Sequence, residues 1–159
     1  MARSKRNGVD MDDDEKDRIL NTVRYIGSRA IYMGRKGEPL TLAEWAERSE
    51  NLEYRRVSYD ELPETSVNPA SYVSTVWLGI DQSFGLIDHP PILFETMRFA
   101  IEAKPMTWPD GHVSQYHPAL EFPDPEGDGT TERMQYYTEE QAHITHRAIV
   151  RLIQEKEMS

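Results

Sequence analysis

The chain has 159 residues, of which 38% are hydrophobic, and its 18 Lys and Arg against 28 Asp and Glu give a formal net charge of −10. This charge argues against a nucleic-acid backbone or an anionic membrane surface as the main partner. No apolar run is long enough for a transmembrane helix, and we expect no secretory signal at the start. The lack of cysteine excludes disulfides and thiolate ligands and fits a reducing cytosol. We expect a disordered tail over residues 1–12 and one domain over residues 13–159.

The first half of the chain predicts two helices and two short strands, the first of them over residues 30–33. Apolar residues at helical spacing predict an amphipathic helix over residues 13–29, with acidic side chains at its N-terminus. Thr41 and Glu44 match a capping box, which predicts a second helix that ends near Asn51. Weak alternation over residues 54–59 indicates an edge strand.

The second half contains the strongest strand predictions. Residues 72–80 and 91–101 are rich in β-branched and aromatic side chains, and a hairpin with a long connecting loop is the simplest interpretation. Residues 134–137 predict a last short strand, after which Thr138 caps a terminal helix. The predicted fold is therefore α+β, a small antiparallel sheet built on a central hairpin and packed by two or three helices.

Much of the negative charge lies in one segment. Residues 102–132 hold seven acidic side chains against one basic one, together with five of the ten prolines. This composition predicts a long irregular insertion. Its negative charge would steer the protein toward a basic surface of a partner. The partner-binding candidates in it are Tyr116, Glu121, Phe122, Asp124, Glu126 and Asp128.

Glu95 is the most informative single residue. Strand alternation places it on the same face as Met97 and Phe99, so we expect it to point with the apolar set toward the core. A carboxylate there needs a partner or a shifted pKa. The structural interpretation, which we favour, is an ion pair with an arginine such as Arg55 or hydrogen bonds to Thr75. The functional interpretation is a general base or a ligand-fixing group.

Two further groups of polar residues are candidate sites. The loop between the predicted strands carries Asp81, Gln82, Asp88 and His89, which suit either metal binding or ordinary turn formation, and we favour the turn. His143 and His146 are three residues apart on one helix face but match no specific metal signature.

No phosphate loop and no nucleophile elbow is present in the sequence. We therefore predict no catalytic residue, no metal and no cofactor. If a small ligand binds, the candidate pocket consists of Thr75, Asp81, Glu95 and His146.

The segments VSTVWLGID (residues 73–81) and PPILFETMRF (residues 90–99) resemble a family of small, functionally uncharacterised proteins of bacteriophages and prophages. Further positions match that family in order along the chain: Tyr32, Gly37, Glu38, Pro39, Leu42, Trp45, Ala46, Ala142 and His146. The family commonly has Asp-His at residues 81–82, where this chain has Asp-Gln, and a short link in place of residues 102–132. The resemblance implies a phage or prophage setting and brings no activity with it.

Our first hypothesis is a non-enzymatic binding module, an accessory protein in the host cytoplasm that binds a host or phage protein and in one version counters a host defence. One alternative is a protein that binds a small, nucleotide-like ligand, or a small hydrolase, with a pocket at Thr75 and Glu95. Another is a minor virion component. A homo-oligomer is compatible with each of them.

Overall fold

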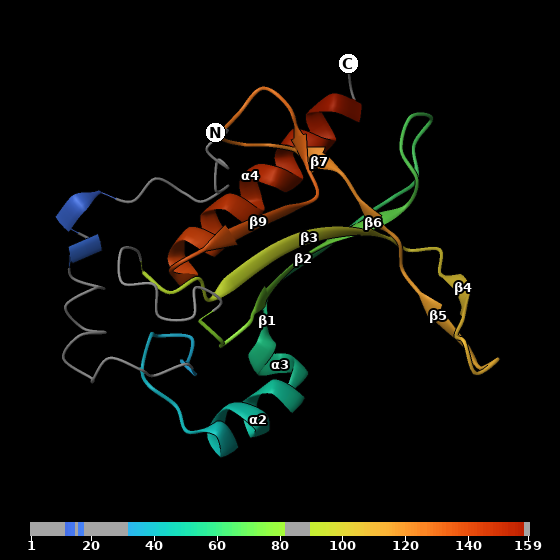
Figure 1. Ribbon diagram of the computed structural model, residues 1–159. Coiled ribbons are helices and arrows are strands. Elements are labelled where there is room, and N and C mark those ends of the chain that lie inside the picture. Colours follow the sequence, from blue (N-terminus) through green and yellow to red (C-terminus); the bar gives the residue numbers. More distant parts are fainter. Residues whose placement is uncertain (1–11, 15, 18–31, 82–89, 158–159) are drawn as a thin grey trace, which may run out of the picture.

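The fold is an antiparallel sheet with one long helix packed across one of its faces (Figure 1). This computed structural model describes residues 12–14, 16–17, 32–81 and 90–157. Most of the predicted tail and most of the helix predicted over residues 13–29 lie outside the described residues, as do Gln82, Asp88 and His89. The α+β prediction is confirmed.

The sheet is built on the predicted central hairpin. Strands β2 (Ser71–Trp77) and β3 (Phe94–Ala100) pair antiparallel without a register shift. Strand β1 (Arg56–Leu62), the predicted edge strand, begins two residues later than predicted and pairs with β2. On the other side of β3, β9 (Arg133–Tyr136) lies beside its first half and β6 (Ala119–Leu120) beside its second half.

Two of the predicted helix starts are confirmed in atomic detail. The hydroxyl of Thr41 accepts the Glu44 N–H, and the Glu44 carboxylate accepts the Thr41 N–H, at the start of α2 (Leu42–Glu50). Thr138 and Gln141 make the same exchange at the start of α4 (Glu139–Glu157). Within the described part of the chain, no helix has the length and apolar character needed to cross a membrane.

The position of helix α4 determines which face of the sheet is buried in the core. Burial alternates strictly along β2 and β3, and the buried apolar residues form one cluster with residues of α4, the helix that lies across this face of the sheet (Figure 1). The core contains Leu62, Val73, Trp77, Leu93, Phe94, Phe122, Met134, Tyr136, Ala142, Ile149 and Ile153. The other face, here called the outer face, carries half-buried side chains, including those of Tyr72, Ser74, Glu95 and Phe99.

The expectation that Glu95 points into the core is therefore wrong. Its neighbours Phe94 and Thr96 are buried, whereas Glu95 is on the outer face. The alternation was identified correctly, but both faces of β3 carry apolar residues, so the period alone does not tell which face a helix will cover.

The prediction of an irregular loop over residues 102–132 is also wrong. This segment folds into β6 and two small two-stranded sheets. One consists of β4 (Lys104–Thr107) and β5 (Val113–Tyr116), the other of β7 (Phe122–Pro123) and β8 (Thr130–Thr131). Strands of two to four residues are too short to show a period in the sequence.

Candidate functional site

A chain of hydrogen bonds runs from the surface into the core beneath α4. On β1, the exposed carboxylate of Asp60 lies 2.8 Å from Nε2 of His146. On the other side of the ring, Nδ1 of His146 lies 2.7 Å from the Thr75 hydroxyl. That hydroxyl is in turn hydrogen-bonded to Thr96 on the adjacent strand. His146 is only 1% exposed and both threonines are fully buried, so Asp60 is the only member at the surface.

Asp60 determines the tautomer of the imidazole, and burial determines its charge. An ionised carboxylate only accepts hydrogen bonds, so Nε2 of His146 donates to Asp60. In the neutral ring Nδ1 then accepts from the Thr75 hydroxyl. Burial lowers the pKa of His146 from its usual value of 6.5, and Asp60 offsets only part of this effect. The imidazole is therefore neutral at pH 7.

The order of carboxylate, imidazole and hydroxyl is that of the hydrolase triads. A nucleophile must reach the reacting atom of a substrate, but the Thr75 hydroxyl is fully buried and bonded to both Thr96 and His146. It could attack a substrate only if the core opened. The chain of hydrogen bonds therefore acts as a structural network that joins α4 to three strands.

Glu95 lies on the opposite side of the sheet from this network. Its carboxylate accepts a hydrogen bond from the Gln135 side chain at 3.1 Å and lies 3.7 Å from the Arg133 guanidinium. Both partners are on the neighbouring strand β9. An arginine partner was expected, but it is Arg133 and not Arg55, because β9 is the strand paired with this part of β3.

The predicted ligand pocket is accordingly split. Thr75 and His146 are in direct contact on the core side, whereas Glu95 faces the other way. Asp81 lies four residues beyond the end of β2, on the connection to β3. Asp60, which the sequence did not single out, replaces Glu95 as the carboxylate of the group.

The split leads to a prediction for Glu95→Gln. The amide retains an oxygen that can accept from Gln135 and loses only the contact with the exposed guanidinium of Arg133. We expect the free energy of unfolding in urea to change by less than about 1 kcal/mol. The neighbouring change Thr96→Val breaks a buried hydrogen bond on the core side, and should cost about 1–2 kcal/mol. If the two costs were reversed in size, this placement of Glu95 would be wrong.

The two helix histidines have separate partners. Nδ1 of His143 lies 2.9 Å from the Ser58 hydroxyl, and its Nε2 lies 3.6 Å from Glu139, which also pairs with Arg35. His146 contacts Asp60 and Thr75 instead. Among the residues that the structure describes, no three His, Asp or Glu side chains gather as a metal ion would require.

A basic hollow of about 490 Å³ lies between the turn at residues 34–37 and α2. Its two guanidiniums are both paired: Arg48 with Glu38 at 2.9 Å, and Arg35 with Glu139. Both also lie over the ring of Tyr54. These contacts compensate the positive charges, and they fasten the turn to α3 (Leu52–Arg55) and to α4.

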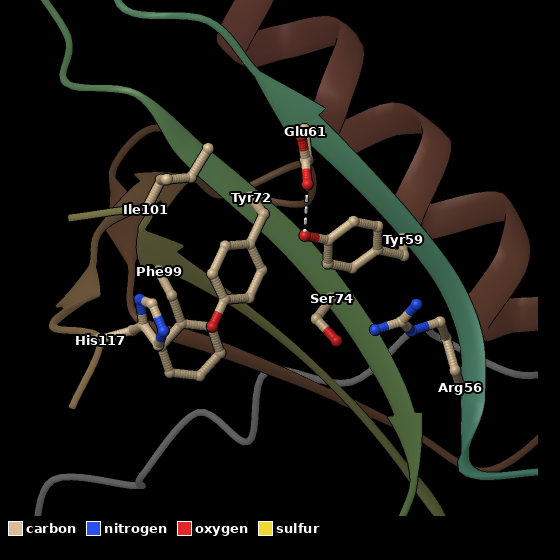
Figure 2. Close-up of a pocket in the computed structure, with 8 residues that line it drawn as sticks. All are labelled: Arg56, Tyr59, Glu61, Tyr72, Ser74, Phe99, Ile101 and His117. Atoms are coloured by element: carbon tan, nitrogen blue, oxygen red, sulfur yellow. Dashed lines mark hydrogen bonds between the residues drawn. The ribbon is translucent and has the colours of Figure 1, made fainter. Parts of the chain in front are cut away.

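The outer face of the sheet carries a second hollow, of about 380 Å³, here called the aromatic hollow (Figure 2). The ring of Tyr72 lies between those of Tyr59 and Phe99, with centroid distances of 5.4 and 5.3 Å. The Arg56 guanidinium lies 4.3 Å from the Tyr59 ring, and His117 approaches Tyr72 edge-on. The sequence did not reveal this ladder, because its rings come from three strands whose register is set by pairing.

The six predicted partner-binding residues separate into three places. Phe122 is 1% exposed and packs in the core, so it does not belong to a contact surface. Tyr116 is exposed on β5. The four acidic residues lie on the segment from Glu121 to Glu132, here called the acidic loop, which β7 and β8 close at its base.

The acidic loop is held by specific contacts. The Asp124 carboxylate accepts the Glu126 N–H at 2.9 Å, and the Asp124 N–H donates to the Gly129 carbonyl at 3.0 Å. Glu121 accepts from the Thr130 hydroxyl across the base of the loop. Buried Phe122 anchors one end of the loop in the core. The acidic side chains are thus presented from a fixed backbone.

Comparison with known proteins identifies no relative. No protein-family model, no curated protein and no solved structure matches the chain. Its function is therefore inferred from the contacts described above.

Proposed function

We propose that this chain is a phage- or prophage-encoded accessory protein that works in the host cytoplasm as a non-enzymatic binding module. It docks on a basic surface of a host or phage protein, and blocking a host defence protein is one role that such docking would serve. The observation that carries the proposal is the acidic loop, which has five carboxylates and no Lys or Arg between Glu121 and Glu132.

The way in which the loop is built supports docking. A loop that is already ordered loses little conformational freedom on binding, so more of its contact energy appears as affinity. Clustered like charges also accelerate association with an oppositely charged partner, in a manner that salt suppresses. The loop has both properties, because Phe122 and the Asp124 turn hold its backbone.

The buried network supports the non-enzymatic part of the proposal. Its hydroxyl, imidazole and carboxylate have the right order for acid–base chemistry, but Thr75 and His146 are enclosed in the core. These groups hold α4 on the sheet. The acidic loop is therefore a better candidate for the functional site than the buried network.

The proposal is tested by neutralising three acidic side chains of the loop together: Glu126→Gln, Asp128→Asn and Glu132→Gln. The wild-type protein should capture a basic host protein in a fixed molar ratio. Each exposed ion pair contributes about 0.5 kcal/mol, so the triple variant should bind that partner about tenfold more weakly. Its affinity should also depend less on salt.

A control variant removes the same charge elsewhere, at three exposed residues of α2 and α3: Glu47→Gln, Glu50→Gln and Glu53→Gln. It should bind like the wild type. Equal weakening by both variants would show that only the net charge matters, and failure of the wild type to capture any protein stoichiometrically would overturn the proposal.

A further inference from the structure

Strands β4 and β5 form an arm, residues 104–116, that leads away from the body of the molecule (Figure 1). The two strands form a two-stranded sheet of their own, and every residue of β4 is exposed. The arm nevertheless carries large apolar side chains at the surface: Met106 at 39%, Trp108 at 46%, Val113 at 55% and Tyr116 at 42% exposure. An isolated hairpin is only marginally stable in water, so an apolar arm of this kind calls for a covering surface.

Most of these apolar side chains gather on one face of the arm. Met106 is paired directly with Ser114, and Tyr116 lies two residues further along the same strand. Side chains of directly opposed residues share a face, as do alternate residues of a strand. The Trp108 indole joins this face, because its Nε1 donates to the Ser114 hydroxyl at 2.9 Å.

The aromatic hollow begins where the arm is rooted. Ile101 precedes the arm and His117 follows it, and both line the hollow. Ile101 is 40% exposed, and His117 is tied to the body of the sheet by a 3.0 Å contact between Nδ1 and the Ala100 carbonyl. The apolar surface therefore continues from the sheet through the root into the arm, although the arm itself points away from the body (Figure 1).

The charges of the arm and of the aromatic hollow indicate what covers them. The arm contains one base, Lys104, and one acid, Asp110. The lining of the hollow likewise contains one base, Arg56, and one acid, Glu61. Both surfaces are thus formally neutral on a chain whose net charge is −10. Two copies can meet there without the repulsion that their acidic loops would cause.

We infer that two copies of this chain exchange arms about a two-fold axis, each laying Met106 and Trp108 into the aromatic hollow of the other. Since every chain has one arm and one hollow, the exchange uses the same contact twice and closes as a dimer. Each arm gains an apolar cover that the described residues of its own chain do not supply. A dimer of this kind would also present two acidic loops to a partner and so increase its avidity.

Sedimentation of the purified protein tests the association. The wild type should sediment as a dimer of 18.4 kDa chains, and the double variant Met106→Ser with Trp108→Ser should sediment as a monomer. The control variant, Leu42→Ser with Leu52→Ser, removes two exposed apolar side chains on α2 and α3 and should remain dimeric. A wild-type monomer at about 100 μM, or assemblies larger than a dimer, would overturn the arrangement.

Disulfide trapping tests the geometry, since the natural chain has no cysteine. A Ser114→Cys chain mixed with a Ser74→Cys chain should form a mixed disulfide, because Ser114 is on the face of the arm that carries Met106 and Ser74 lines the hollow. A disulfide forms only where the two Cα atoms come within about 7 Å of each other. Glu47→Cys in place of Ser74→Cys is the control and should not react. Preferential linkage of Ser114→Cys to itself would show that the arms pair with each other, contrary to the proposal.

These outcomes are separate from those of the proposed function. The triple variant of the acidic loop should remain a dimer while it binds its partner more weakly. The arm variant should become monomeric while a single acidic loop still binds that partner, with reduced avidity.

Discussion

Replacing His146 by alanine is expected to lower the free energy of unfolding by about 3 kcal/mol. The imidazole is 1% exposed and connects α4 to Thr75 and Asp60, so its removal leaves a cavity and deprives the buried Thr75 hydroxyl of a partner. The remaining carboxylate of Asp60 is exposed and can be hydrated, which limits the loss.

Urea unfolding measures this loss, and His143→Ala is the matched control on the same helix. His143 is partly exposed and contacts Ser58 on β1, so its removal should cost about 1 kcal/mol or less. Equal losses for the two variants would contradict a special role for the buried ring.

The pH dependence of the same unfolding experiment gives a second readout. The folded pKa of His146 is lowered by burial, so at mildly acidic pH the unfolded chain binds a proton that the folded chain does not. Its contribution to stability is therefore complete above about pH 6.5 and decreases as the pH falls toward the lower folded pKa, by at most about 1.4 kcal/mol per pH unit. His146→Gln should lack this component, and a wild-type slope of opposite sign relative to the variant would show that the imidazole is charged in the fold.

Gly79→Ala is expected to lower the free energy of unfolding by about 3 kcal/mol or more, by a different mechanism. Gly79 has φ +68°, where an alanine costs about 1–2 kcal/mol. Its added Cβ would also overlap the ring of Trp77. That ring is buried and donates through Nε1 to the Met33 carbonyl at 2.9 Å, so it cannot move freely, and forced displacement in a core adds about 1–3 kcal/mol.

Gly37→Ala separates the two contributions. Gly37 has φ +81°, but a Cβ there meets nothing within 4 Å. Thermal or urea unfolding should therefore show a loss of about 1–2 kcal/mol, from the backbone alone. If Gly79→Ala were as stable as Gly37→Ala or more stable, the ring of Trp77 would be able to move aside for the added Cβ. The expected difference explains physically why a glycine follows Trp-Leu in the motif at residues 77–79.

How far the sequence predicts the structure differs between elements. The hairpin of β2 and β3 and the start of α4 were predicted, because a strand's composition and a capping box depend on residues close together in the chain. The strands within residues 102–132 were missed, because each has at most four residues and β6 is held by pairing with a distant strand. For the candidate site, Thr75 and His146 were identified as candidates, but their partner Asp60 was not.

The sequence by itself determined the local elements of this protein, the alternation along its central strands and the concentration of negative charge in one segment. Only the tertiary structure decided what those elements face. Packing of α4 made one of two apolar faces the core and turned Glu95 outward. It also brought Asp60 to His146, 86 residues away, and strand register built the aromatic hollow from three strands. These contacts depend on pairing between distant segments, which no local pattern of residues specifies.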